Sequence, residues 1–475
     1  MSSSPPTPPR KAPSNETEWR FKPLSAPTEW IESYRPGGLH PIHLGDTLCG
    51  GRFKVVRKLG YGSSSTVWLA QDTHHNQLGQ TGTRSGRRAT SYGSVVAIKV
   101  MIADAPADSK ESEMYKLISD TPADDQAKDH VLSLLDQCDH EGPNGTHRCM
   151  VFEPMGPSVG MLMDSEDGEG VQLAQAKSIL KDTLLGLHCL HSCRIAHGDL
   201  NQGNLLTTLR PSHDQNPQAL GQKPTPDNIS DPVTRKDGKP DRWAPRYLCL
   251  DRPLTELVDA NGAFRTKLTD LGAAFFFDDH PADPATPLGL RAPEHILHGP
   301  VDHSIDIWAF GCLVYEIFTG FQLFAISDFG STETENNDSH LLEMTDVLGP
   351  LPPALYEKWD RRHRYFGPGG EAIRTGVGPD EPSKYPMAFI APLEERFGEA
   401  KPEEMGKEET AQVLALIRRI LQYDPALRPS TAELLEDEWF KNIGSGEGEE
   451  SASSRSENDA AALDSTSVDS GVVSS

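Results

Sequence analysis

The stretch IAHGDLNQGNLL, from Ile195 to Leu206, decides how the rest of the chain is interpreted. Short apolar arms flank a polar loop in which Asp199 precedes Asn204 by five positions. At that spacing the carboxylate can accept a proton from an attacking hydroxyl, while the amide oxygen holds a metal ion on phosphate groups. The stretch therefore favours phosphoryl transfer, although an ordinary polar surface loop can carry the same letters by chance.

A pair of glycines lies between two β-rich runs in GRFKVVRKLGYGSSSTVWLAQD, Gly51 to Asp72. Gly60 and Gly62 allow the backbone to approach a phosphate closely, and Val67 can cover a flat base from above. A hairpin turn also requires glycine, so both interpretations stay open when this stretch is taken alone.

A lysine inside a buried strand is the next polar feature, in SVVAIKV. Burial of an unpaired Lys99 would be costly, so we expect it to reach phosphates and to be held by a carboxylate on the following helix. Glu113 is the predicted partner and Glu111 the alternative, since both lie in the same helical stretch. The competing interpretation is an exposed edge-strand lysine beside a solvated glutamate.

Two later segments are expected to complete a nucleotide site. In HRCMVFEPMG, backbone groups near Glu153 and Met155 are expected to meet the edge of an adenine ring. In KLTDLGAAFFF, Asp270 follows a strand and is predicted to hold Mg²⁺ together with Asn204.

The second half of the chain predicts a helical body. Its apolar run, from Trp308 to Ile326, contains Glu316 and Gln322 and therefore predicts a buried helix instead of a membrane span. Glu294 of RAPE and Arg428 of DPALRPS are expected to form a buried ion pair that braces this body.

The composition describes an acidic chain of 475 residues with 36% hydrophobic residues and a formal net charge of −25. Such a surface repels nucleic acid and attracts a basic polypeptide, and the simpler alternative is that acidity keeps the protein soluble. The opening residues lack the apolar segment of a signal peptide, so we expect a cytosolic or nuclear protein without a membrane partner. Seven irregularly spaced cysteines predict buried core residues, and neither a disulfide framework nor a zinc cluster.

Three segments differ from the body in composition. Residues 1–29 are rich in Pro and Ser and predict a flexible arm, with order beginning near Trp30. A Pro/Asn/Asp-rich insertion at about 207–266 is expected to be functional or disordered. Residues 444–475 are acidic and of low complexity, which predicts a disordered tail.

Seven motifs in order, GYGSSSTV, VAIK, HGDLNQGN, DLG, RAPE, DIWAFG and DPALRPS, resemble the eukaryotic protein kinase family across about residues 45–443. Within that family the chain resembles the SR-protein kinases, especially their fungal branch, through ESYRPGGLHPIHLGD, LGYGSSSTVWLA, CMVFEPMG, DLGAA and the long insertion. HLLEMTDVLGPLP resembles the extra helical segment of kinases in the same larger group. The resemblance implies an α+β, two-lobed fold, with a β-rich N-lobe at 30–156 and a helical C-lobe at 157–443. It also implies ATP- and Mg²⁺-dependent phosphorylation of Ser in basic, Arg/Ser-rich splicing or RNA-binding proteins.

The resemblance also assigns roles to individual residues. It implies catalytic roles for Lys99, Glu113, Asp199 and Asn201, and metal binding by Asn204 and Asp270. The nucleotide contacts that it implies are Leu59, Gly60, Tyr61, Gly62, Ser63, Ser64, Ser65, Val67, Ala97, Lys99, Glu153 and Met155.

At four positions the residues differ from the family pattern or bear on how the protein would be regulated. Gly198 stands where an Arg is common, and Thr286 is the only Ser or Thr between the DLG and RAPE motifs, so we expect activity not to require phosphorylation of that segment. Asn201 stands where most protein kinases carry Lys, and Pro287 where a Thr often pairs with that Lys. An amide supplies a hydrogen bond without charge, which predicts turnover lower by about one to two orders of magnitude or a replacement contact.

Three functions remain open on the sequence. The first is an active Ser/Thr protein kinase, and the second is a small-molecule phosphotransferase, because HGDLNQGN also resembles the catalytic loop of aminoglycoside and choline kinases. The third is a catalytically weak scaffold that binds basic partners. RAPE, DIWAFG and DPALRPS favour a protein kinase over a small-molecule kinase, because in protein kinases these motifs build a platform for polypeptides.

Overall fold

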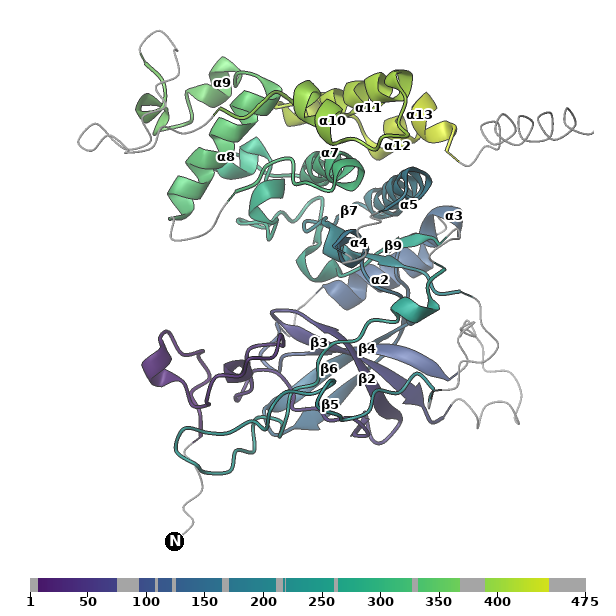
Figure 1. Cartoon of the computed structure of the whole chain (residues 1–475), viewed down its shortest axis with the longest axis vertical. Coiled ribbons are helices and arrows are strands. Elements are labelled where there is room, and N and C mark those ends of the chain that lie inside the picture. Colours follow the sequence, from purple (N-terminus) through teal and green to yellow (C-terminus); the bar gives the residue numbers. More distant parts are fainter. Residues whose placement is uncertain are drawn as a thin grey trace, which may run out of the picture.

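A six-stranded antiparallel sheet forms the smaller of two lobes (Figure 1). The computed structural model describes residues 7–74, 94–106, 110–121, 125–164, 171–210, 217, 219–259, 264–326, 332–367 and 389–443. The strand order is β1-β2-β3-β4-β6-β5. The strands are β1 Thr47–Leu48, β2 Phe53–Tyr61, β3 Ser65–Asp72, β4 Val95–Met101, β5 Leu134–Gly142 and β6 Gly145–Phe152, and helix α2 spans Glu111–Asp120.

Strand β4 lies inside this sheet and is buried on both faces. Its apolar residues alternate between two hydrophobic clusters, as the two-residue period of a strand requires. Val95 and Ala97 pack in the large cluster that continues into the second lobe, whereas Val96 and Ile98 pack in a separate cluster on the other face. Lys99 pairs with Val67 of β3 and with Met150 of β6, which fixes its position in the centre of the sheet.

Helices form the second lobe, which lies above the sheet in Figure 1. Every residue of α7 is buried, so the predicted buried helix is confirmed there, and Gly320 ends it in the left-handed conformation. Among the described residues, no helix combines the length and the apolar character needed to cross a membrane. The helices are α3 Asp125–Lys128, α4 Val159–Met163, α5 Leu173–Ser192, α6 Pro293–Ile296, α7 Ser304–Thr319, α8 Glu333–Leu348, α9 Pro353–Tyr356, α10 Leu393–Ala400, α11 Lys407–Ile420, α12 Thr431–Leu435 and α13 Glu438–Lys441.

Two short ladders hold the loop that carries Asp199. Strands β7 (Ile195–Ala196) and β10 (Phe275–Phe276) form one ladder, and β8 (Leu205–Thr207) and β9 (Thr266–Leu268) form the other. The insertion therefore leaves the lobe from β8 and returns to it at β9, beside its starting point.

The described part of the insertion packs along strand β2. Strand β1 covers only the beginning of β2, which leaves backbone groups further along β2 available to another segment. Gln222 donates its backbone N–H to the Val56 carbonyl at 2.8 Å, and Arg252 donates to the Lys58 carbonyl at 2.9 Å. The insertion thus joins the helical lobe to the sheet, and Figure 1 shows it in teal beside the purple N-terminal segment.

The prediction of a flexible arm is wrong for residues 20–29. Phe21 is 2% exposed and forms a β-bridge with Arg235 of the insertion. Glu29 forms a buried ion pair with Lys58 of β2. The Pro/Ser content concealed these contacts because their partners lie far away in the sequence. Residues 1–6 and the predicted tail, 444–475, lie outside the described residues.

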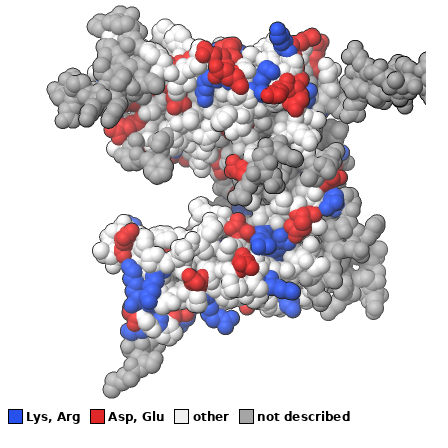
Figure 2. Space-filling view, in the orientation of Figure 1, with Lys and Arg blue, Asp and Glu red and all other residues white. Residues whose placement is uncertain are grey.

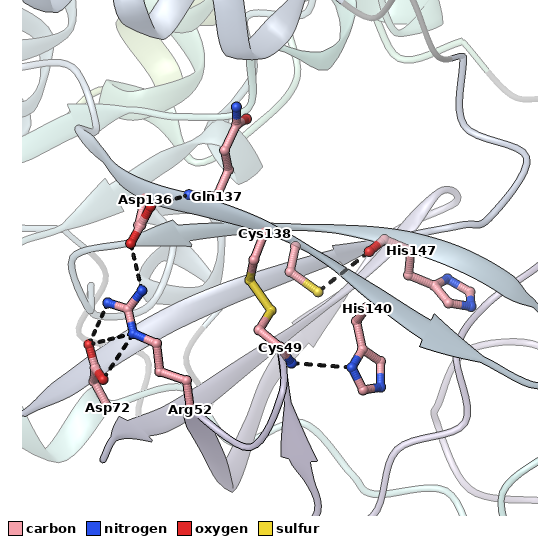
Figure 3. Close-up of a disulfide and its surroundings, with 9 residues drawn as sticks. Cys49, Arg52, Asp72, Asp136, Gln137, Cys138, His140 and His147 are labelled. Atoms are coloured by element: carbon pink, nitrogen blue, oxygen red, sulfur yellow. Dashed lines mark hydrogen bonds and ion pairs between the residues drawn. A yellow bond between two sulfur atoms is a disulfide. The ribbon is translucent and has the colours of Figure 1, made fainter. Parts of the chain in front are cut away.

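A disulfide joins Cys49 to Cys138 of β5, with 6.1 Å between the Cα atoms (Figure 3). The prediction that the cysteines form no disulfide is therefore wrong for this pair. Its two members are separated by 89 positions, one just after β1 and the other in β5, the first and last strands in the order of the sheet. The other cysteines are free and buried, as predicted for core residues, and these are Cys149, Cys189, Cys193, Cys249 and Cys312.

Candidate active site

A cavity of about 540 Å³ lies between the two lobes, where Figure 2 shows a cleft. Strands β2 to β4 supply one wall, the segment after β6 supplies the back, and the loops after β7 and β9 supply the floor. The predicted residues that line it are Leu59, Gly60, Tyr61, Gly62, Ser65, Val67, Ala97, Lys99, Glu153, Met155, Asn204 and Asp270. The other predicted residues do not line it: Ser63, Ser64, Glu113, Asp199 and Asn201.

Lys99 is held by two carboxylates on the floor and wall of the cavity. Its Nζ lies 2.7 Å from Asp270 Oδ1 and 3.0 Å from Glu111 Oε1. Burial alone would lower the pKa of Lys99, but the two carboxylates outweigh burial and raise it. Lys99 is therefore a permanent cation directed at the cavity.

The predicted partner of Lys99 is corrected from Glu113 to Glu111. Helix α2 begins at Glu111, whose buried side chain points toward the sheet. Glu113 lies two residues further along, which is more than half a helical turn, and its side chain is exposed. The lysine and a helical glutamate pair as expected, but the first glutamate of the helix supplies the contact.

Two amides orient the carboxylate of Asp199. Asn204 Nδ2 donates to Asp199 Oδ2 at 3.0 Å, and Asn201 Nδ2 donates to Asp199 Oδ1 at 2.9 Å. Both amides also donate to the Asp199 carbonyl, at 2.8 and 3.0 Å. Burial raises the pKa of Asp199, whereas His197 and the two amides oppose that rise. The carboxylate is thus fixed by two neutral donors, and its pKa stays above the ordinary value because burial outweighs their effect.

The backbone of this loop is anchored to helix α7 by Asp306, a role that the sequence alone did not assign. The buried carboxylate of Asp306 accepts from the backbone N–H groups of His197 at 2.7 Å and Gly198 at 2.9 Å, and contacts His191 at 2.9 Å. Burial alone would raise the pKa of Asp306, but the His191 contact helps to lower it. An acidic residue at the start of an otherwise apolar helix was the signal in the motif DIWAFG.

Gly198 adopts a conformation that excludes a larger residue. Its φ is +75°, and a Cβ at this position would lie 2.6 Å from the Ala273 carbonyl oxygen. Its own carbonyl accepts a hydrogen bond from the hydroxyl of Thr286, which is 3% exposed, at 3.0 Å. The only Ser or Thr of this segment is therefore buried and engaged with the loop.

Asp270 and Asn204 provide a donor set that fits Mg²⁺, which prefers carboxylate, amide and water oxygens. Both residues line the same cavity. Burial would raise the pKa of Asp270, but Lys99 outweighs burial and lowers it, so the carboxylate is anionic. Asp270 holds a left-handed backbone with φ +60°, and its side chain accepts from the Gly272 N–H at 3.1 Å. This turn directs the carboxylate toward the cavity.

Behind the cavity, Glu153 and Met155 follow strand β6. Met155 is buried, and the Glu153 carboxylate lies 2.7 Å from Lys267 Nζ, so its side chain is engaged within the protein. Further away, the predicted buried pair is confirmed, because Arg428 donates to both oxygens of Glu294 at 2.6 and 2.7 Å.

A cleft between a β-rich and a helical lobe, an anchored lysine and a loop that presents Asp199 and Asn204 are together typical of a protein kinase. A protein kinase domain model matches residues 256–440. The serine/threonine-protein kinase SRPK of Physarum polycephalum is 30% identical over 87% of this chain and 92% of its own length. Protein kinase dsk1 of Schizosaccharomyces pombe is 25% identical over 87% of this chain and 85% of its own.

A solved kinase domain superposes with a TM-score of 0.54 at 22% identity, covering 84% of this chain and 98% of that chain, and supports the two-lobed fold. The chain belongs to the eukaryotic protein kinase family, in its SR-protein kinase group, and is a serine/threonine protein kinase.

Proposed function

We propose that this kinase transfers the γ-phosphoryl group of ATP, with Mg²⁺, to serines in basic, Arg/Ser-rich proteins of the cytoplasm or nucleus. The observation that carries the proposal is the meeting of Lys99, Asp270 and Asn204 at one cavity, with Asn204 also bonded to Asp199. Phosphoryl transfer requires a cation on the phosphates, metal ligands and a base for the hydroxyl, and these residues supply all of them.

Each residue has a defined task in this reaction. Asp199 accepts the proton of the substrate hydroxyl as that oxygen attacks phosphorus, while the amides of Asn201 and Asn204 keep its carboxylate in place. Lys99 donates to phosphate oxygens. Mg²⁺ held by Asp270 and Asn204 would neutralise further charge on the phosphates.

The glycines between β2 and β3 support a phosphate-binding role for this hairpin. A Cβ at Gly60 or Gly62 would meet no protein atom within 4 Å, so packing within the protein does not account for glycine there. Close approach of the backbone to a phosphate accounts for both residues.

The contacts of Asn201 support a role in positioning Asp199, in place of the charge neutralisation that a lysine would provide. Its side chain bonds to Asp199 and also accepts from the Gly203 N–H at 2.8 Å, so it stiffens the loop that presents the base. It lacks the charge that a lysine would bring to the transferring phosphoryl group. We therefore expect an active kinase with a low turnover number.

The net charge of −25 supports a basic substrate, because a strongly acidic surface accelerates encounter with cationic polypeptides. Gln202, on the loop beside Asp199, donates to the buried carboxylate of Glu316 at 3.0 Å. Burial raises the pKa of Glu316 to about 7, and the hydrogen bond from Gln202 opposes that rise.

The test is transfer of labelled phosphate from Mg-ATP to an Arg-Ser repeat peptide. An Ala-Ser peptide of equal length controls for charge, and a mixture of aminoglycosides and choline tests the small-molecule alternative. We expect label only on the Arg-Ser peptide and none with Asp199→Asn. Equal labelling of both peptides would overturn the substrate assignment, and ATP binding without transfer would favour a scaffold.

A further inference from the structure

The insertion reaches the same cavity as the site residues. Asp251 and Pro253, which lie between β8 and β9 in the chain, line the cavity together with Leu59, Gly60 and Lys99. A segment that interrupts the helical lobe thus contributes to the wall beside the glycine hairpin.

The position of Asp251 is fixed by bonds on both sides of it. On one side, Gln222 Nε2 donates to the Leu250 carbonyl at 2.9 Å. On the other side, the Arg57 guanidinium of β2 donates to the carbonyls of Arg252 at 2.6 Å and Pro253 at 2.7 Å. Strand β2 leads directly into the hairpin that carries Gly60, so Asp251 is held against the root of that hairpin.

The backbone beside Asp251 is bonded to the strand that carries Leu59. The neighbouring Arg252 bonds to Lys58, which immediately precedes Leu59, a residue expected to cover the base. The insertion then continues toward the segment after β6, where a Cβ on Gly156 would lie 2.5 Å from Val258 Cγ2. Asp251 therefore lies on the wall between the root of the hairpin and the segment after β6, the region that would face the sugar of a nucleotide whose base meets Met155.

The other carboxylates that line the cavity already have partners. Glu111 and Asp270 bond to Lys99, and Glu153 bonds to Lys267. A carboxylate repels a triphosphate, but it is a strong acceptor for the adjacent hydroxyls of a ribose. Burial and then the Asp251 carboxylate raise the pKa of the Tyr61 hydroxyl, which places the charge on the hairpin side of the cavity.

We propose that Asp251 accepts hydrogen bonds from the ribose hydroxyls of ATP, so that the insertion forms part of the nucleotide site and selects ribonucleotides. This inference rests on the proposed use of ATP. Loss of a charged hydrogen-bond acceptor predicts about a tenfold weaker affinity for ATP in Asp251→Ala.

Calorimetric dissociation constants for Mg-ATP and for Mg-2′,3′-dideoxy-ATP test the inference on the full chain. We expect the wild type to bind ATP about tenfold more tightly than the dideoxy compound, and Asp251→Ala to reduce that ratio to less than threefold. Asp227→Ala, on the exposed surface of the same insertion, is the matched control and should retain the wild-type ratio. Asp251→Asn, which preserves shape, should give an intermediate ratio.

An unchanged ratio in Asp251→Ala would overturn the inference, as would equal weakening of both nucleotides, which indicates a structural role. Either result leaves the proposed kinase function standing, because the wild type still binds ATP. Failure of the wild type to bind ATP would instead overturn the proposed function and this inference together.

Discussion

The ion pair of Lys99 distinguishes between the two glutamates of helix α2 that were its candidate partners. Glu111 touches its ammonium group and Glu113 faces solvent. We expect Glu111→Gln to lower kcat/KM at least about tenfold, because the lysine loses one of its two carboxylates and its position over the phosphates. Glu113→Gln is the matched control and should stay within about twofold of wild type. Steady-state kinetics with the Arg-Ser peptide distinguish the two, and a larger loss in Glu113→Gln would restore the original prediction.

Asp199 is the residue whose removal should have the largest effect on turnover. A positioned general base contributes about 10² to 10⁴ in rate, so Asp199→Ala should lower kcat at least about 100-fold. Thermal unfolding should show that the variant remains folded, because Asn201 and Asn204 can also bond to the backbone carbonyl. A loss smaller than tenfold would assign the base to another group.

Site residues could be predicted from the sequence where their chemical type and a short motif were enough to indicate their role. Lys99, Asp199, Asn204 and Asp270 lie in short motifs, and the structure brings them together. The glutamate partner of Lys99 could not be chosen, because Lys110 caps α2 without a side-chain hydrogen bond and gives no signal for the first helical residue. Asp251 had no motif at all, and only the path of the insertion reveals it.

At the scale of elements, the segment between β10 and α6 is held by a buried threonine. Thr286 donates to Gly198 and is 3% exposed, so a kinase acting in trans has no access to its hydroxyl in this conformation. We expect phosphatase treatment of the purified chain to leave activity within about twofold, and mass spectrometry to find Thr286 unmodified. Abolished activity after phosphatase treatment would show that another phosphorylated site controls the kinase.

Arg428 ties the turn before α12 to α6 and α7. Its guanidinium is buried and bonds to both oxygens of Glu294 and to the Ser304 carbonyl. Arg428→Ala leaves an uncompensated buried carboxylate, so we expect a loss of about 3 to 5 kcal/mol in the free energy of unfolding. Arg419→Ala removes an exposed pair with Asp437 and should cost less than about 1 kcal/mol. Denaturant unfolding measures both, and equal losses would contradict the bracing role.

Some helices and strands could be predicted from the sequence, whereas other segments could not. Helix α7 and strand β4 could be predicted because a continuous apolar run specifies burial without reference to a partner. The insertion could not be placed, because its Pro- and Asn-rich sequence has no periodicity and its contacts with β2 and the N-terminal segment join residues far apart in the sequence. The Cys49–Cys138 disulfide was missed for the related reason that spacing along the chain says nothing about proximity across a sheet.

At the scale of the whole molecule, the N-terminal segment, β2 and the insertion converge on Lys58. Its ammonium group is fully buried, pairs with Glu29 and donates to the Cys249 carbonyl at 2.9 Å. A chain that begins at Trp30 lacks Glu29 and leaves that charge buried without its carboxylate, so we expect a loss of at least about 3 kcal/mol in stability. A chain that begins at Trp19 retains the contact and should unfold like the full chain. Denaturant unfolding compares the two, and equal stability would mean that residues 19–29 behave as the flexible arm that their composition predicts. Because β2 leads into the glycine hairpin, the shorter chain should also bind ATP more weakly, which links this distant segment to the nucleotide site.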